Sequence, residues 1–366
     1  MPEFLSLTAS LSPELQAVTS RANLEVGRFD GSLLGLVNPA VLLSPLTTQE
    51  AVLSSRIEGT ISTLQEVLLV QASDDVDLAP ERRNSAIEVV NYRKALGLAI
   101  EALGTRPFTF GLVKDLHKVL MDSVRGQDKS PGQIRNGLAF IGPRGATSLS
   151  QARYVAPEPL HLPSLLDNLE GYIATCTDDP VIAAAIVHAQ FEMIHPFEDG
   201  NGRIGRMLIP LYLYHCKALH SPVFYLSEYL DKHWETYFAA LQGISKRDDW
   251  DGWLWFFVKA VEEQAQKNTK KARAIIDLYE ITKHNLYDIA ETRFSFPLLD
   301  SLFDLVIFKS HGFINYTGIP ERTAMRLLHD LRKAGILKIL RPKSGNQAAI
   351  MAFAELLNLV EGREVI

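Results

Sequence analysis

Apolar residues recur at the spacing of an α-helix along most of this chain, and extended patterns are scarce. The spacing predicts helices over residues 82–103, 110–124, 162–174, 181–194 and 204–218, together with one or two helices over residues 47–69 that break near Gly59. A long, largely polar helical pattern over residues 253–287, interrupted at most at Asn268 and Thr269, predicts a helix that bridges two domains. The chain is therefore predicted to be all-α.

Two segments depart from the helical pattern. Residues 137–141 and 153–155 are short extended stretches on either side of the turn sequence Gly142–Gly145, which predicts a β-hairpin. Near the C-terminus, strand patterns over residues 336–340 and 348–353 follow helical patterns over residues 297–308 and 321–334. The expected fold is a helical core with a small hairpin, followed by an α+β module.

Length and composition exclude several classes of protein. The 366 residues are 47% hydrophobic and 22% charged, which is typical of a globular chain of two or three domains and not of a disordered or fibrous one. The net charge of −6 gives no global field for polyphosphates, and the two cysteines, Cys176 and Cys216, cannot build a disulfide framework or a cysteine-ligated zinc site. Without a signal-peptide pattern or a membrane-spanning window, we expect a cytoplasmic protein with no membrane partner.

The patterns divide the chain into four parts. These are an N-terminal helical region (1–104), a core (105–260), a linking helix (261–292) and a C-terminal module (293–366). Residues 301–350 hold eight Lys and Arg against three acidic residues, so the C-terminal module is basic.

The segment from His195 to Arg206 lies between two predicted helices and carries the densest chemistry. Gly200, Asn201 and Gly202 at the start of the second helix leave backbone N–H groups free and allow an anion to approach closely. Together with the helix dipole, these groups form a phosphate cradle.

The side chains around this cradle suit a nucleotide phosphate. Arg203 and Arg206 share a helix face, so both can reach a polyphosphate. Asp199 is a hard oxygen ligand for Mg²⁺ shared with phosphates, and His195 can accept a proton from an attacking nucleophile. The structural alternative is a helix N-cap at Asp199 or Asn201 beside two solvated arginines.

The run from His195 to Arg206 fits, at every fixed position, the signature of the Fic family, His-x-Phe-x-[Asp/Glu]-Gly-Asn-Gly-Arg-x-x-Arg. The chain thus resembles enzymes that usually transfer AMP from ATP to a protein hydroxyl side chain. The resemblance implies a Fic-fold helical core and a homodimer. It also assigns these roles: His195 as the base, Asp199 as the Mg²⁺ ligand, Gly200, Asn201 and Gly202 as the anion hole, Phe197 as an apolar anchor, and Arg203 and Arg206 as ligands of the outer phosphates.

Three further segments gain a role from this resemblance. Ser54, Glu58 and Gly59 fit the family's inhibitory pattern, [Ser/Thr]-x-x-x-Glu-[Gly/Asn], which implies an inhibitory helix over about residues 47–60 whose Glu58 pairs with Arg206. The same glutamate leaves removal of AMP open as a second activity. The hairpin (138–141 with 154–157) is similar to the flap that aligns the target by strand addition, with an ordinary surface hairpin as the alternative. The resemblance also offers Tyr229 as a residue that stacks on the nucleotide base, with a core tyrosine as the alternative.

The C-terminal module resembles a winged helix, with residues 322–337 as a recognition helix that leads into a wing. In that interpretation Arg322, Arg326, Lys333 and Lys343 would meet DNA. Residues 314–320, however, leave too little chain for the usual scaffold helix before it, so a protein-docking or dimerisation element is the alternative.

Three hypotheses of function follow. The first is a self-inhibited Fic adenylyltransferase that uses ATP and Mg²⁺ on an unknown target protein. The second is a DNA-binding transcriptional regulator whose Fic site senses a nucleotide, and the third is a Fic transferase with another phosphate-containing donor, such as UTP or a phosphocholine carrier.

Overall fold

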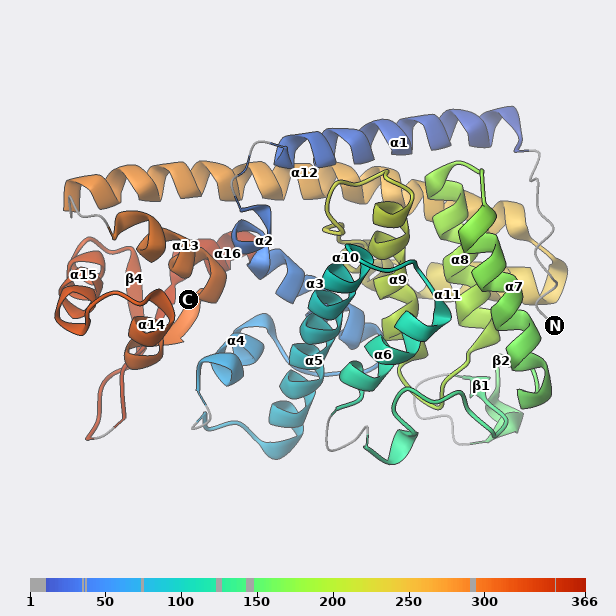
Figure 1. Ribbon diagram of the computed structural model, residues 1–366, viewed down its shortest axis with the longest axis horizontal. Helices are drawn as coiled ribbons and strands as arrows, with labels where there is room; N and C mark the ends of the chain where they lie inside the picture. The colour runs from blue at the N-terminus through green and yellow to red at the C-terminus, as the bar shows by residue number, and fades with distance from the viewer. Residues whose placement is uncertain are drawn as a thin grey trace. The chain divides into compact units, whose positions relative to one another are not determined.

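The computed structural model describes residues 11–34, 36, 38–73, 76–122, 127–142, 148–289, 294–345 and 347–366. It is dominated by helices, as predicted. The α-helices are α1 (Pro13–Leu33), α2 (Pro39–Leu42), α3 (Ser44–Ile57), α4 (Leu64–Ala72), α5 (Pro80–Leu103), α6 (Phe110–Leu120), α7 (Leu162–Thr175), α8 (Pro180–Ile194), α9 (Asn201–His215), α10 (Ser227–Lys232), α11 (Trp234–Arg247), α12 (Trp250–Ile289), α13 (Ser295–Leu305), α14 (Ser310–Thr317), α15 (Glu321–Lys333) and α16 (Ala354–Glu361). Figure 1 shows their order along the chain.

The chain forms two compact units, and each takes three separate stretches of sequence. The first unit holds the segment that ends at Gly31, then Leu53–Thr60 and Asn91–Lys267. The second holds Ser32–Val52, Ile61–Val90 and the chain from Asn268 onwards. Helix α12 continues without a break from the first unit into the second.

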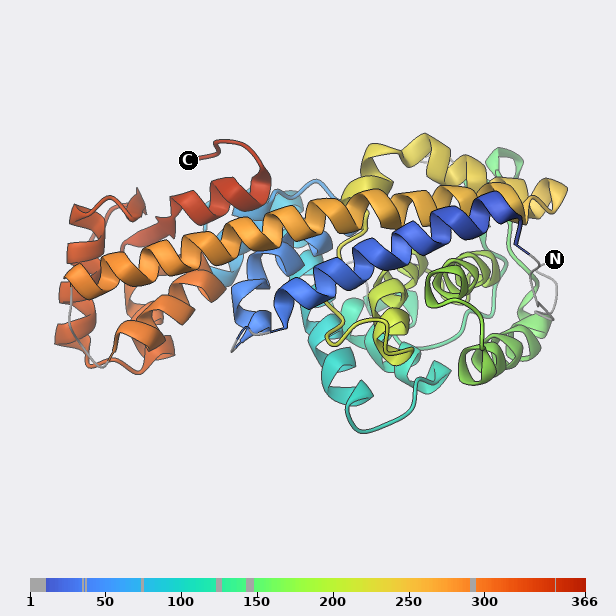
Figure 2. The ribbon, with the colours of Figure 1, turned by 90° about the horizontal axis from the view of Figure 1, so that it is seen from above.

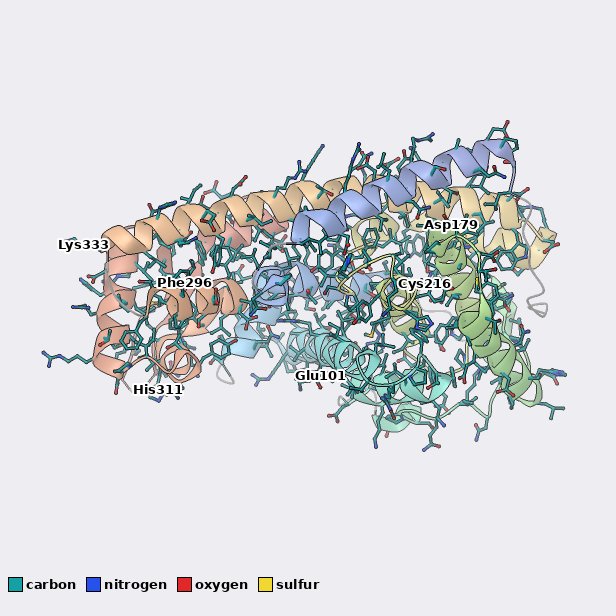
Figure 3. All side chains as sticks on the ribbon, turned by 45° about the horizontal axis from the view of Figure 1, so that its top comes forward. Glu101, Asp179, Cys216, Phe296, His311 and Lys333 are labelled. Atoms are coloured by element: carbon teal, nitrogen blue, oxygen red, sulfur yellow. The ribbon has the colours of Figure 1, made fainter. Side chains whose placement is uncertain are left out.

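Helices α8 and α9 form the centre of the first unit. Every residue of α8 after Pro180 is buried, because this helix is largely apolar and is enclosed by its neighbours. Asp179 caps its start: the Oδ1 atom accepts from the backbone N of Val181 (2.9 Å) and of Ile182 (3.3 Å). Asp179 is labelled at this end of α8 in Figure 3.

Helix α1 lies along the first part of α12 in both Figure 1 and Figure 2. Its buried side chains recur at helical spacing and are Leu15, Val18, Ala22, Val26 and Phe29. Arg21 adds an ion pair to Glu262 of α12, with 2.9 Å between Nε and Oε1. The N-terminal segment is therefore part of the first unit's packing.

The predicted hairpin is present as two short antiparallel strands. Strand β1 (Phe140–Ile141) pairs with β2 (Tyr154–Val155), with Phe140 opposite Val155 and Ile141 opposite Tyr154. Gly142 is described, whereas residues 143–145 of the expected turn lie outside the described residues.

The C-terminal part of the second unit runs α13, β3 (Ile307–Lys309), α14, α15, β4 (Leu337–Arg341), β5 (Ile350–Phe353) and α16, and its antiparallel sheet has the strand order β3-β5-β4. The expectation that too little chain precedes the basic helix was wrong. Helix α14 occupies Ser310–Thr317 and Gly318, in the left-handed conformation (φ 66°), ends it. The helix begins earlier than expected, directly after β3, which leaves room for a full two-turn element.

None of the helices in the described part of the chain combines the length and the apolar character that crossing a membrane requires.

Candidate active site

The loop between α8 and α9 is fixed at both of its ends. His195 follows α8 in the left-handed conformation (φ 50°), an uncommon state for a residue with a side chain, and Gly200 precedes α9 with φ 78°. The Asn201 amide closes the loop, because Oδ1 accepts from the Phe197 N–H and Nδ2 donates to the Phe197 carbonyl, both at 2.8 Å. The run predicted from the sequence is thus one rigid turn.

His195 presents a neutral ring at this turn. Its Nδ1 lies 3.2 Å from the carbonyl oxygen of Glu192, and because a carbonyl only accepts, Nδ1 carries the proton. Burial lowers the pKa of His195 to about 4, with the Glu192 carbonyl acting in the opposite direction. The unprotonated Nε2 atom is therefore the one that can take a proton at neutral pH.

Asp199 is the most exposed of the predicted site residues, with half of its side chain in contact with solvent. Its Oδ1 atom lies 3.4 Å from Nη2 of Arg203, four residues along the chain. Within the described part of the chain, no three His, Cys, Asp or Glu side chains converge to hold a metal on their own. A single exposed carboxylate beside an anion cradle does fit Mg²⁺, which is commonly held by one or two carboxylates together with substrate phosphates.

Arg206 is buried, and its guanidinium is held by the segment at the end of α3. Its Nε donates to Oγ of Ser54 (3.0 Å), and its Nη2 donates to the Ser54 carbonyl (2.9 Å) and to Oε1 of Glu58 (2.7 Å). Although burial opposes the charged form, the negative charge of Glu58 raises the pKa of Arg206 above its ordinary value. The structure thus brings together the two residues that the inhibitory pattern pairs.

Glu58 also covers the start of α9. A Cβ atom built on Gly202 would lie 2.1 Å from Oε1 of Glu58, so only glycine fits beneath this carboxylate. The Glu58 carboxylate therefore occupies space next to the first backbone N–H groups of α9, where an anionic ligand would bind.

Several residues that support the loop were not identified from the sequence. His117 on α6 accepts from the Gly132 N–H at Nδ1 (2.8 Å), so its Nε2 donates to the carbonyl of Asp199 (2.9 Å). Its ring also stacks on Phe197 with 3.8 Å between centroids. Contacts between residues so far apart in sequence leave no pattern in spacing or composition that would reveal them.

Arg135 links the loop to the hairpin. This buried side chain donates to the carbonyls of His195 (2.7 Å), Gly137 (2.7 Å) and Pro157 (2.6 Å). Tyr154 of β2 adds a hydrogen bond from its hydroxyl to the Met193 carbonyl (2.8 Å). The hairpin is thereby held at a fixed position next to His195.

A second cluster of buried polar side chains contacts α9. His188 donates from Nδ1 to the Gly205 carbonyl and accepts the Tyr237 hydroxyl at Nε2, both at 2.9 Å. Glu192 lies in the same region, and burial raises its pKa to about 8. Its Oε1 atom has no hydrogen-bond partner among the described residues.

A cavity of about 280 Å³ opens between the hairpin and α11. It is mainly apolar, and its lining includes Ile141, Tyr154, Met193, Trp234, Phe238 and Gln242. Because Met193 is two residues before His195, the cavity lies beside the motif loop. Tyr229 is not one of the lining residues: its ring packs on His233, with 4.3 Å between centroids, and on Phe256.

Models of two regions of one known protein family match this chain. The model of the Fic/DOC family matches residues 107–213, which contain the whole motif loop, and the model of the Fic/DOC family N-terminal region matches residues 16–101. This chain belongs to the Fic/DOC family. Glu58, Ser54 and α3 thus lie in the family's N-terminal region, and His195, Asp199 and Arg206 lie in its main domain.

Curated Fic relatives are named as adenylyltransferases. A probable protein adenylyltransferase of Aquifex aeolicus is 41% identical over 59 residues, or 16% of this chain and 18% of the relative. A protein adenylyltransferase of Caenorhabditis elegans is 31% identical over 83 residues, or 22% of this chain and 14% of the relative. The matches thus span less than a fifth of the length of either relative.

Solved structures show the same fold. A Fic family protein of Desulfovibrio desulfuricans G20 superposes with a TM-score of 0.59 at 20% identity, covering 95% of this chain and 98% of that one. Fic-1 of C. elegans gives a TM-score of 0.53 at 17% identity, covering 72% of this chain and 75% of that one. At these identities the likeness establishes the fold alone.

Proposed function

We propose that this chain is a protein adenylyltransferase that transfers AMP from ATP to a Ser, Thr or Tyr hydroxyl of a target protein, and that Glu58 holds it in an inhibited state. The ion pair between Glu58 and Arg206 over the start of α9 carries the proposal. It places a carboxylate beside the group best suited to bind a terminal phosphate. The names of the curated relatives support the same activity.

The reaction follows from the groups at the loop. The target hydroxyl gives its proton to Nε2 of His195 while its oxygen attacks the α-phosphorus of ATP. The new O–P bond forms as the bond between the α-phosphorus and the bridging oxygen breaks, so pyrophosphate leaves with that oxygen. The N–H groups at the start of α9, with Arg203 and Arg206, neutralise the phosphates and orient them for in-line displacement.

Asp199 would hold Mg²⁺ on the exposed side of this cradle. The ion would supply charge neutralisation on the phosphate oxygens. Asp199 is itself held by its backbone, since its carbonyl accepts from His117, so the side chain starts from a fixed point.

The cavity between the hairpin and α11 is our proposed site for the nucleotide base. Tyr154, Trp234 and Phe238 give it aromatic walls, and its volume of about 280 Å³ leaves room for a planar base. Trp234 has a buried indole N–H without a hydrogen-bond partner among the described residues, which a base nitrogen or oxygen could accept. We prefer this cavity to Tyr229, which packs on its own neighbours.

The hairpin is the proposed guide for the target segment. Apolar Leu138 and Val155 are exposed on it, at 60% and 47%, and a two-stranded ribbon has edges that an extended peptide can extend. Arg135 keeps the hairpin next to His195, so a peptide on its edge would bring a hydroxyl to the base.

Labelled ATP tests this function directly. Wild type, Glu58→Gly and His195→Ala are incubated with Mg²⁺ and ATP labelled on the α-phosphate, and label on protein is counted. We expect strong labelling with Glu58→Gly, at least about tenfold above wild type because an arginine–carboxylate pair is removed, and none with His195→Ala. Glu101→Gly is the matched control, since Glu101 is an exposed carboxylate near the end of α5 (Figure 3) and should behave as wild type.

The remaining hypotheses give different results in the same assay. Loss of label from pre-labelled target, dependent on Glu58, would indicate AMP removal. Label from UTP but not from ATP would change the donor. ATP binding without any transfer in all variants would contradict the enzyme and favour a nucleotide-sensing regulator.

A further inference from the structure

The C-terminal helix α15 carries an exposed stripe that the proposed enzyme does not use. Its members are all exposed and are Arg322, Met325, Arg326, His329 and Lys333. The last four lie three, four, seven and eleven residues after the first, so all five share one helix face. Figure 3 marks Lys333 at the end of this helix. We call this set the α15 stripe.

The stripe is separated from the core and from acidic groups. The opposite face of α15 is buried through Ala324, Leu327, Leu328 and Leu331, so the stripe must face away from the sheet. The two acidic residues of the helix, Glu321 and Asp330, flank the stripe on opposite sides, about 100° and 80° from Arg322 at 100° per residue. Within the described part of the chain, no ion pair occupies Arg322, Arg326 or Lys333.

Neighbouring elements add cations beside the stripe. A short turn at Gly318 joins α14 to α15, so α15 is held at its start by a second helix. Strand β4 follows with exposed Lys338, and exposed Lys343 lies in the loop between β4 and β5. Basic side chains thus continue past the end of the stripe.

We propose that the α15 stripe binds double-stranded DNA, with α15 in the major groove. An exposed helix of 13 residues, about 20 Å long at 1.5 Å per residue, fits this groove. Arg322 and Arg326, near its start, would reach guanine edges or phosphates, and Lys338 and Lys343 would contact the flanking backbone. The half-exposed apolar side chain of Met325, at 48%, suits a thymine methyl group.

Geometry favours DNA over RNA duplexes, and the stripe offers groups for both the acceptors and the methyl groups of base edges. The major groove of A-form RNA is too narrow and deep for a helix. Base edges offer both acceptors for the arginines and methyl groups for Met325. Methionine and arginine are also common at protein–protein interfaces, so an acidic protein is the competing partner in the experiment.

The test uses the full chain and duplexes of random sequence, with binding followed by fluorescence anisotropy over a range of salt concentrations and then by rounds of selection. We expect selection to enrich a sequence that binds at least about 10³-fold more tightly than random duplex. Arg322→Gln and Arg326→Gln should each weaken binding about tenfold and reduce the slope of log K against log salt by about one. The matched control is Arg363→Gln, an exposed arginine of the same unit that lies outside α15, which should stay within about twofold of wild type.

Other outcomes would overturn the proposal. If selection enriches nothing, or if Arg363→Gln weakens binding as much as the stripe variants, the cations act only as a diffuse charge. Displacement of DNA by polyglutamate at equal charge concentration would assign the stripe to an acidic protein. His195→Ala should bind DNA as wild type does, so this result is independent of the proposed transferase.

Discussion

At the scale of single residues, the motif loop is held by buried polar groups with defined partners, such as Asn201 and Arg206, whereas, within the described part of the chain, the buried carboxyl of Glu192 has an oxygen without one. Its Oε1 atom is unpartnered among the described residues, and its raised pKa of about 8 means that it carries a proton at neutral pH. Arg206 already has Glu58 as its counter-charge, so an ionised Glu192 would be a buried negative charge without a positive partner of its own. Glu192 is thus a buried acid whose protonation is coupled to folding.

Glu192 should make the folded state less stable as the pH rises. Between about pH 5 and 8 the folded protein keeps the proton that the unfolded chain, with a carboxyl pKa near 4.5, has already lost. The free energy of unfolding of wild type, relative to Glu192→Gln, should therefore fall with pH in this window, by up to about 1.4 kcal/mol per pH unit. Urea titrations of both proteins at several pH values measure the difference, and a difference that is flat with pH would contradict the protonated carboxyl.

His195 should remain an effective base in mildly acidic solution. Since burial lowers its pKa to about 4, below the ordinary value of 6.5, the ring stays neutral until the pH approaches 4. In the Glu58→Gly background, kcat/KM for the target should change less than about twofold between pH 7.5 and 5.5 on account of this group. A fall centred near pH 6.5 would show that His195 is solvated.

At the scale of elements, the hairpin and the motif loop act as one piece because Arg135 joins them. Carbonyls from three separate segments share this guanidinium, so no smaller side chain can replace it. The consequence is that the position of β1 and β2 relative to His195 depends on a residue that contacts neither nucleotide nor target.

Arg135→Lys should separate target alignment from nucleotide binding. Lysine can reach one or two of the carbonyls and leaves the others unpaired, which should lower the free energy of unfolding by about 1–3 kcal/mol. Transfer to the target should fall at least about tenfold. The Kd for ATP should rise by a smaller factor, because the hairpin wall of the base cavity shifts while the anion cradle on α9 is untouched. Arg106→Lys, a surface exchange, is the control, and equal losses of ATP affinity and transfer would contradict a role confined to the hairpin.

For the individual elements, the sequence predicted features that depend on neighbouring residues and missed contacts between residues far apart in the chain. The helices α5, α7 and α8 and the strands β1 and β2 lie close to the predicted ranges because apolar spacing and turn residues are local signals. Helix α14 was missed because only a few of its eight residues are buried. Eight residues are also too few for a clear helical spacing of apolar side chains. The motif loop could be predicted because its groups are contiguous, whereas His117, Arg135 and Tyr237 reach the site through folding over long separations.

At the scale of the whole molecule, each compact unit is assembled from three stretches of chain, so neither is a contiguous fragment. In the second unit, α4 packs on β3 of the C-terminal part, and its buried side chains are Leu64, Val67 and Leu68. These contacts join residues more than 230 positions apart, and no reading of local patterns reveals them.

Removal of the C-terminal part should therefore lower the solubility of the remaining chain as well as abolish DNA binding. A fragment that ends at Ile289 lacks β3 and exposes the apolar face of α4, so its soluble yield should fall about tenfold or more through aggregation. A fragment that ends at Arg363 keeps β3 and α16 and serves as the control. Equal yield and equal thermal stability of the two fragments would show that α4 does not depend on β3.

The contact between Glu58 and Arg206 spans 148 residues, with the glutamate first in the chain. On a ribosome that adds about 5–20 residues per second, Glu58 leaves the exit tunnel roughly 7–30 seconds before Arg206 does. Helix α9 can thus form its anion cradle only when its inhibitor has already been made. If Glu58 inhibits as proposed, the nascent enzyme passes through no stage at which a complete catalytic loop exists and its restraint does not.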